Sequence, residues 1–305
     1  MKRGAVIGIA AGFAALAVVV GVTAVLLSRP PSPEAAAESY LRGLSEGDFD
    51  AIAPLLPDTA DAEHLEASFD GATGYISDYS YTLAEDSSGT LGVRADVEID
   101  GDPGVVHFLL VPDSGGWLIG DFLAGLNVST TIDGDVIVND SVLVGDVLTP
   151  ASTTLLPAVY AVSPTPAGIL SGGTEVAVTN EEPVDLAVEA SLAPAATAWA
   201  QEQLDVYATA CAEPRAEVPP NCGIRVPWAA DLGTLDGIRF RIEQLPRVSL
   251  SPDGRTFAAT GGVLIATAAG TARDGSAASF TYRADDWSLR GSIRFSGEEM
   301  TLRVG

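Results

Sequence analysis

The chain has 305 residues, of which 47% are hydrophobic, and its formal net charge is −25. Such an acidic surface repels nucleic acid and anionic lipid headgroups, so neither is an expected partner. Lys2 is the only lysine, and this excludes Ser-x-x-Lys acylation, Schiff-base catalysis and a Walker phosphate-binding loop in the sequence that follows it.

The N-terminal segment is typical of a membrane anchor. An uncharged apolar run from Gly4 to Leu27 follows the basic pair Lys2 and Arg3. As a helix this run would be roughly 36 Å long, enough to cross a hydrocarbon core of about 30 Å. A cleaved secretory signal is the alternative, but its apolar region usually has about 7–15 residues and ends at a small-residue cleavage site. Here the run is longer, and proline-rich sequence follows it.

The length therefore favours an uncleaved single-pass transmembrane helix over residues 4–27. Residues 1–3 would form a cytoplasmic tip, because the basic pair precedes the helix and acidic sequence follows it. Residues 28–33 would be a short tether. The rest of the chain would be an ectodomain outside the cell membrane.

A first domain is expected over residues 34–127. Ser32, Pro33 and Glu34 form a good helix start, and two more short helices are expected over 49–56 and 62–69. After Gly74 apolar residues recur at every second position. This period predicts strands, separated by Asp- and Gly-rich turns, over 75–84, 90–100, 104–112 and 116–124. Helices followed by an antiparallel meander predict an α+β domain.

A small all-β module is expected over residues 128–193. Helical periodicity disappears there, and short apolar runs alternate with Gly, Pro, Asn and Asp. Asp133, Asp135 and Asp140 lie close together in the sequence, but they lack the residue order of a calcium-binding loop. A hairpin turn accounts for them better, and no metal site is predicted.

A second α+β domain is expected over residues 194–305. Its first helix has apolar residues at helical spacing, ending at Cys211. Cys211 and Cys222 are the only cysteines, and they enclose a short proline-rich loop. Outside the membrane such a pair predicts one disulfide. The strands expected after the loop lie at 237–244, 246–251, 256–268, 277–283, 287–295 and 299–304.

Charge divides the chain near Cys211. Residues 32–210 contain 30 Asp and Glu but only two arginines, whereas residues 211–305 contain 11 acidic residues and 11 arginines. Several of these arginines alternate along predicted strands and should share one solvent-exposed face: Arg239, Arg241, Arg290, Arg294 and Arg303. Such a face is either simply solvated, or recognises anions, or receives the acidic first domain.

Two stretches of the first domain, Glu38–Asp50 and Gly115–Asp121, resemble the NTF2-like superfamily in its extracytoplasmic, membrane-anchored form. The resemblance implies a helix-backed curved sheet that forms a cone, and a second NTF2-like domain at the C-terminal end. The Leu-Pro-x-x-Tyr sequence at 156–160 is similar to an element of small β modules. The whole order is similar to uncharacterised membrane proteins of high-GC Gram-positive bacteria. More loosely it resembles teicoplanin-resistance-associated membrane proteins, whose cytoplasmic zinc ribbon has no counterpart in this sequence.

The mouth of the first-domain cone is where acid–base chemistry could be assembled. His107 lies in a run that is apolar on both faces, Asp121 lies late on the next predicted strand, and Tyr40 and Tyr81 could approach them. An Asp–His or Asp–Tyr pair in an apolar cone would suit a proton-transfer isomerase, because burial raises the pKa of a carboxylate. A lone histidine on a strand is, however, more often a hydrogen-bonded core residue. No spacing places an acid–base pair, so we predict no catalytic residues and no cofactor.

The sequence thus predicts a non-enzymatic cell-envelope protein, a scaffold or sensor that binds another envelope protein or a cell-wall component. The alternative is a module that holds a small apolar ligand in the cone, near His107, Tyr40, Tyr81 and Asp121. An isomerase-type enzyme is the third hypothesis. A large open cone would favour the ligand, and a cone filled by its own side chains would favour the scaffold. The oligomeric state is not indicated by the sequence.

Overall fold

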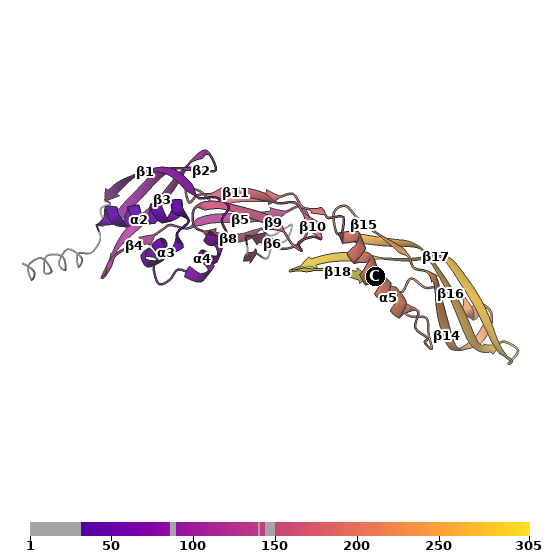
Figure 1. Cartoon of the computed structure of the whole chain (residues 1–305). Helices are drawn as coiled ribbons and strands as arrows, with labels where there is room; N and C mark the ends of the chain where they lie inside the picture. Colours follow the sequence, from indigo (N-terminus) through magenta and orange to yellow (C-terminus); the bar gives the residue numbers. More distant parts are fainter. Residues whose placement is uncertain (1–31, 86–89, 140, 144–149) are drawn as a thin grey trace, which may run out of the picture. The chain divides into compact units, whose positions relative to one another are not determined.

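The computed structural model (Figure 1) describes residues 32–85, 90–139, 141–143 and 150–305. The predicted cytoplasmic tip, the predicted transmembrane helix and nearly all of the tether lie outside these ranges. Within them, no helix combines the length and the apolarity needed to cross a membrane. The described chain is α+β with strands predominating, and it divides into two compact units. One unit contains residues 76–122 and the described residues up to Glu63; the other contains residues 64–75 and 123–305.

The first unit begins with the first predicted helix. α2 (Pro33–Glu46) starts after Ser32, whose hydroxyl accepts a hydrogen bond from the backbone N–H of Ala35, the usual N-cap contact. It ends at Gly47, whose left-handed φ of 67° suits glycine at a helix C-terminus. The second predicted helix is split into α3 (Phe49–Ile52) and the 3₁₀ turn η1 (Ala53–Leu55), because Pro54 has no N–H with which to continue an α-helix.

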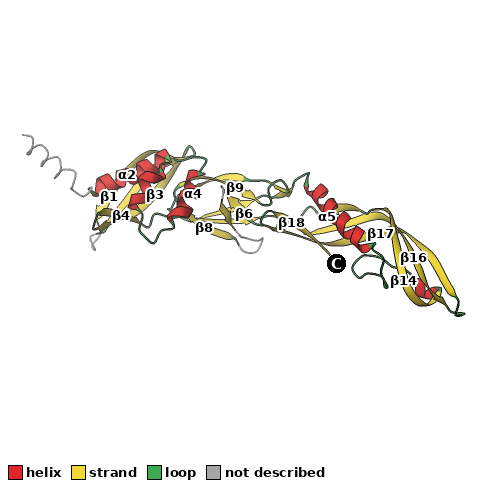
Figure 2. Ribbon diagram, turned by 60° about the horizontal axis from the view of Figure 1, so that its bottom comes forward, coloured by secondary structure: helices red, strands yellow, loops and turns green. Residues whose placement is uncertain are grey.

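The strands of the first unit form one antiparallel sheet in the order β1-β2-β3-β4. Their bounds are Ile76–Glu85, Leu91–Ile99, Asp102–Asp113 and Gly116–Gly120. α2 lies over one face of this sheet (Figure 2) and contacts β1 and β3, while η1 contacts β4. The side chains that alternate toward the core are buried: Val93, Ala95, Val97, Val106, Phe108, Leu110 and Ile119. Side chains that alternate toward the opposite face, such as Arg94, Asp96 and Leu109, are exposed, so we call it the uncovered face.

The third predicted helix, α4 (Ala62–Asp70), contributes most of its residues to the second unit. The Asn139 side-chain amide donates to the carbonyl of Ser68 at 2.9 Å, and this bond joins the helix to the β strands that follow the first unit. The predicted first domain of residues 34–127 is therefore interrupted by a segment, residues 64–75, that packs elsewhere.

Two sheets form the middle of the chain. β5 (Ala124–Thr130) is central in the smaller one, pairing antiparallel with β8 (Ala151–Leu155) and parallel with β12 (Val184–Val188). The larger sheet has the order β11-β9-β6-β7, with bounds Thr174–Val178, Ala158–Pro164, Val136–Val138 and Ser141–Leu143. A short pair, β10 (Leu170–Ser171) and β13 (Ser191–Leu192), completes the module. Because β5 begins at Ala124, the domain boundary predicted at residue 127 falls inside a strand.

The Leu-Pro-x-x-Tyr sequence has a local structural role in this module. Tyr160 lies in β9 and is fully buried, and its hydroxyl donates to the carbonyl of Leu156 at 2.7 Å. Burial also raises the pKa of the Tyr160 hydroxyl, so it remains a donor throughout the pH range of a folded protein. The tyrosine therefore closes the turn that enters β9 and fills the core at the same time.

The C-terminal part of the second unit is a helix on a five-stranded antiparallel sheet (Figure 2). α5 (Ala196–Cys211) packs on the strands through a shared core with Phe257, Leu264 and Leu289. The sheet order is β14-β16-β17-β18, with β15 also pairing with β16. The bounds of β14 to β18 are Leu232–Gln244, Arg247–Leu250, Thr256–Ala272, Ala277–Ser296 and Glu299–Val304.

β17 is one continuous strand where the sequence predicted two, 277–283 and 287–295. Gly262 is opposite Trp287 and Leu264 is opposite Ala284, so β17 carries one more residue than β16 between these pairs. This extra residue is a β-bulge. It reverses the apolar alternation near residue 285 without ending the strand, which is why the pattern alone indicated a break.

The predicted disulfide between Cys211 and Cys222 is confirmed, with a Cα–Cα distance of 5.7 Å. It joins the end of α5 to the loop that leads back to the sheet. The indole N–H of Trp287 donates to the carbonyl of Cys222 at 2.7 Å, so the loop is also held to β17. The disulfide and this hydrogen bond together fix residues 211–222 against the sheet.

Loss of the disulfide is expected to destabilise the second unit by about 3 kcal/mol, the value that the loop-entropy model assigns to a loop of this size. Thermal unfolding of the full chain, followed by circular dichroism with and without a reductant, measures the effect. The double variant Cys211→Ser/Cys222→Ser should behave like the reduced protein. The first unit contains no cysteine, so its unfolding is the internal control, and equal melting temperatures with and without reductant would contradict the expectation.

Asp135 has a structural role that the sequence did not indicate. Its carboxylate accepts a hydrogen bond from the backbone N–H of Gly297 at 2.6 Å, and the Thr165 hydroxyl donates to the carbonyl of the same glycine at 2.9 Å. The β module thus holds the turn between β17 and β18. Asp140, the third member of the acidic group, lies outside the described residues.

Candidate functional site

The four residues predicted to line a cone lie on two different faces of the first sheet. Tyr40 and Tyr81 are on the face that α2 covers, and His107 and Asp121 are on the uncovered side or at its edge. The structure therefore brings only His107 and Asp121 together among the contacts of the described residues, and the four do not form one constellation.

Tyr40 occupies the middle of the helix–sheet core. Its side chain is fully buried, and its ring packs edge-on against Phe108 with 4.7 Å between the ring centroids. Tyr81 is half-buried and donates from its hydroxyl to the carbonyl of Glu34 on α2 at 3.4 Å. Desolvation, and then the charges of nearby Glu38 and Glu34, raise the pKa of Tyr81. Both tyrosines thus join α2 to the sheet, and Tyr40 is part of the core and does not line an open surface.

His107 and Asp121 form a pair that is close to solvent. His107 lies between two buried residues of β3, Val106 and Phe108, so its own side chain points to the uncovered face and is 38% exposed. Its Nε2 lies 4.0 Å from a carboxylate oxygen of Asp121, which is 72% exposed. Asp121 is not late on β4 as predicted but follows the strand, with a left-handed φ of 50°. The pair lacks the apolar enclosure that proton-transfer catalysis in a cone would require.

The outer face of the C-terminal sheet, which is the face opposite α5, is the most distinctive surface among the described residues. Strand alternation places large apolar side chains toward α5 and polar ones outward. The cross-strand register puts seven exposed arginines on this outer face: Arg239, Arg241, Arg247, Arg283, Arg290, Arg294 and Arg303. The sequence pattern predicted five of these. It missed Arg283 because of the bulge in β17, and Arg247 because β15 is too short to show alternation.

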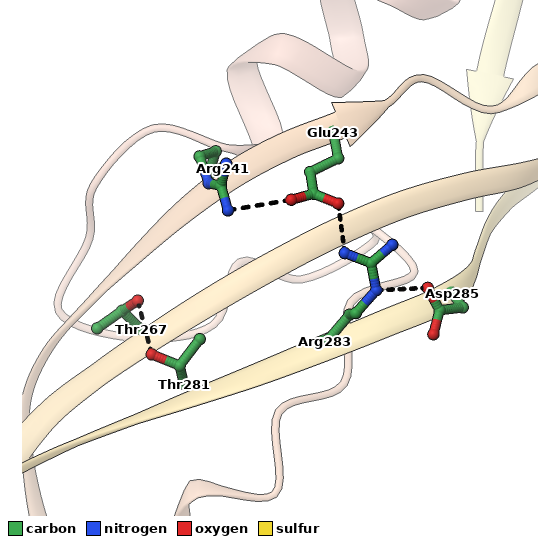
Figure 3. A network of polar contacts seen from close by, with 6 residues as sticks. All are labelled: Arg241, Glu243, Thr267, Thr281, Arg283 and Asp285. Carbon is green, nitrogen blue, oxygen red and sulfur yellow. Dashed lines mark hydrogen bonds and ion pairs between the residues drawn. The ribbon is translucent and has the colours of Figure 1, made fainter.

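Ion pairs link the arginines at the β14 end of the outer face (Figure 3). Glu243 on β14 pairs with Arg241 at 3.0 Å and also with Arg283, which reaches it from β17 across β16. Arg283 in turn donates from Nε to Asp285 at 2.7 Å. These hydrogen bonds, first that to Glu243 and then that to Asp285, raise the pKa of Arg283. Such exposed pairs contribute little to stability, but they offset the charge of two of the four arginines at this end, Arg241 and Arg283.

The β18 end of the outer face has a different charge balance. Arg290, Arg294 and Arg303, which we call the arginine cluster, have no carboxylate within 4.0 Å among the described residues. Arg303 is directly opposite Ser292, and Arg294 is opposite Thr301. Because Arg303 is one diagonal step from both other arginines, its Cα should lie about 7–8 Å from each of theirs.

The arginine cluster borders a shallow depression of about 560 Å³. Its polar lining includes Thr256, Arg290, Ser292 and Arg303. Positive guanidinium groups therefore alternate with hydroxyl groups on a surface without a covering element. Guanidinium and hydroxyl groups are hydrogen-bond donors, so the chemistry that this surface suits is recognition of anions.

No protein-family model matches the chain, and comparisons with curated proteins and with solved structures likewise gave no match. The residues themselves are therefore the basis for a functional assignment.

Proposed function

We propose that the chain is a non-enzymatic, single-pass cell-envelope protein whose ectodomain is a scaffold or sensor and binds an envelope component through the outer face of its C-terminal sheet. The observation that carries this proposal is the set of seven exposed arginines on one uncovered sheet face. In a chain with a net charge of −25, such a concentration of positive side chains favours attraction of an anionic partner. The apolar run Gly4–Leu27 supports the membrane anchor.

Two observations favour a binding role over an enzymatic one. The candidate acid–base residues are divided between opposite faces of the first sheet, with Tyr40 buried in the core and His107 close to solvent. Both cysteines are in the disulfide, which leaves no thiolate nucleophile. The packing of Tyr40 on Phe108 also argues against an apolar ligand in the first unit.

The proposal includes a fold assignment, that the first unit and the C-terminal part of the second unit are NTF2-like domains. The first unit has a capped helix followed by an antiparallel meander that the helix covers on one face. The second unit repeats a helix followed by an antiparallel sheet, with α5 preceding β14 to β18. Both arrangements are compatible with helix-backed NTF2-like sheets, and fold alone would not assign an activity.

Co-sedimentation with isolated cell-envelope material tests the proposed function. The full chain, purified in a neutral detergent, is mixed at low salt with cell-wall fragments and separately with membrane vesicles stripped of peripheral proteins. We expect it to sediment with at least one fraction and to be released as salt rises, because contacts between exposed charges are screened. An unrelated acidic membrane protein of similar size is the control. A chain that stays in the supernatant with both fractions at low salt would overturn the proposal.

A further inference from the structure

We propose that the arginine cluster, Arg290, Arg294 and Arg303, binds an extended polymer that carries phosphodiester groups along its backbone. This inference rests on the proposed function and narrows its partner from an envelope component to an anionic polymer. It assigns the binding to the β18 end of the outer face and not to the face as a whole.

The close grouping of arginines without a carboxylate partner selects this location. Arg239 and Arg247 also have no carboxylate within 4.0 Å among the described residues, but they are opposite Thr267 and Thr260, seven positions apart on β16. At the β14 end, Glu243 and Asp285 already occupy the guanidinium groups of Arg241 and Arg283. At the β18 end the three guanidinium groups have no carboxylate within 4.0 Å among the residues that the structure describes. Glu299 lies on the same face, since it is opposite Ser296, but it leaves the cluster with excess positive charge. An incoming anion therefore meets donors that need not first release an internal partner.

The backbone brings the three arginines close together. Gly291, between Arg290 and Ser292, is opposite Val304 on β18. A Cβ atom at this position would lie 1.9 Å from the carbonyl oxygen of Arg303, so only glycine permits β18 to approach this closely. Because both strands belong to a paired sheet, the guanidinium groups start from fixed backbone positions and less ordering is required when a ligand binds.

The donor set suits phosphodiester groups. A guanidinium group forms two parallel hydrogen bonds to phosphate oxygens, and hydroxyl groups can donate to the oxygens that remain. Ser292 lies among the three arginines, and Thr301 is opposite Arg294. The donors come from two neighbouring strands of one sheet face, so they are spread over an area and could contact successive phosphate groups of one chain. Arg290 and Arg294 are four residues apart on β17, about 13 Å, so one polymer chain could contact both.

The composition of the face argues against a protein partner. Protein–protein interfaces have a desolvated centre with aromatic or large apolar anchors. The side chains that share this face with the arginine cluster on β16, β17 and β18 are small or polar: Thr256, Ala258, Ser292, Ser296 and Thr301. Binding would therefore depend on charge and hydrogen bonds, which is typical of recognition of a polyanion chain.

Binding of poly(glycerol phosphate) to the full chain in a neutral detergent tests the inference. A fluorescently labelled polymer is titrated at several salt concentrations, and anisotropy gives the dissociation constant. We expect the variant Arg290→Gln/Arg294→Gln/Arg303→Gln to bind roughly 30-fold more weakly or worse, because three charge-assisted contacts are lost. The slope of log K against log salt concentration should also fall in magnitude by about 2, the value for three phosphate contacts.

A matched control separates local recognition from net charge. Arg94, Arg215 and Arg273 are exposed and line neither of the depressions that Arg290 lines, and their replacement by Gln changes the net charge by the same amount. This control should bind within about threefold of the unaltered chain and keep its salt slope. Circular dichroism and thermal unfolding establish that both variants are folded. An Arg290→Lys/Arg294→Lys/Arg303→Lys variant should recover the salt slope but only part of the affinity, because an ammonium group lacks the bidentate geometry.

Several outcomes would overturn the inference. If the cluster variant binds the polymer as the unaltered chain does, the site is elsewhere. If poly-glutamate of equal charge binds as tightly as poly(glycerol phosphate), the site is not selective for phosphate. If the chain self-associates at low salt and the cluster variant does not, the occupant is the acidic part of a second copy. If the chain does not bind the polymer but still sediments with envelope material, only this inference is contradicted and the proposed function remains. If the chain binds the polymer but does not sediment with envelope material, only the proposed function is contradicted.

Discussion

Replacement of Trp287 by alanine is expected to lower the free energy of unfolding of the second unit by about 5 kcal/mol. The indole is 2% exposed and packs in the core that α5 shares with the sheet, and truncation of a buried aromatic residue costs about 3–5 kcal/mol. The variant also leaves the carbonyl of Cys222 without the donor that now lies 2.7 Å away, and an unpaired buried acceptor adds about 1–3 kcal/mol.

Urea unfolding of the full chain, followed by tryptophan fluorescence and circular dichroism, measures this effect. Trp199→Ala is the matched control, because Trp199 lies on α5 and is 53% exposed; its effect should stay within about 0.5 kcal/mol. Trp287→Phe keeps most of the ring and removes only the donor, so an intermediate loss of about 2 kcal/mol is expected. A loss below 1 kcal/mol for Trp287→Ala would show that the loop and the helix do not depend on this residue.

Local signals predicted many of the elements. Ser32 and Gly47 mark the ends of α2, and Asp- and Gly-rich turns separate β2, β3 and β4 near the predicted positions; the turn predicted over 86–89 lies outside the described residues. These are short-range effects of capping and turn chemistry, which depend on a few neighbouring residues. The disulfide could also be predicted, because a chain with only two cysteines has one possible intramolecular pairing.

Features that depend on tertiary contacts could not be predicted. The run around His107 has apolar residues on both faces of the strand, so its pattern did not indicate which face the helix covers. Leu109 and Val111 lie on the uncovered face and are 38% and 43% exposed. The association of residues 64–75 with the second unit depends on contacts such as that of Asn139 with Ser68, which are distant in sequence. The bulge in β17 likewise depends on its pairing with β16.

The candidate surface was easier to predict than the candidate pocket, because a surface on a strand depends on local alternation and a pocket depends on tertiary contacts. Period-two alternation places every second residue of a strand on one face, so arginines separated by an even number of positions share that face, whichever elements lie around it. A pocket instead requires that side chains from several elements converge and leave space between them. Tyr40, Tyr81, His107 and Asp121 do not converge in this way.

Tyr40→Ala should lower the free energy of unfolding of the first unit by about 4 kcal/mol. Tyr40 is fully buried and makes an edge-on contact with Phe108, which is itself 1% exposed, so truncation removes apolar contacts and leaves a cavity between α2 and the sheet. His107→Ala, on the uncovered face, should change this free energy by no more than about 0.5 kcal/mol. Urea unfolding of the full chain and of the two variants provides the comparison.

The contrast between the two variants distinguishes a filled core from an open cone. In an open cone Tyr40 would contact ligand or solvent, and its truncation would have little effect on stability while weakening ligand binding. In a filled core the contacts of Tyr40 are already formed in the unligated chain. Tyr40→Ala therefore lowers the free energy of unfolding even when no ligand is present. If both variants were equally mild, the packing of Tyr40 on Phe108 would not contribute to folding, and the apolar-ligand hypothesis would regain its basis. A large loss for Tyr40→Ala alone would leave recognition to the exposed surfaces, of which the arginine cluster has the clearest chemistry.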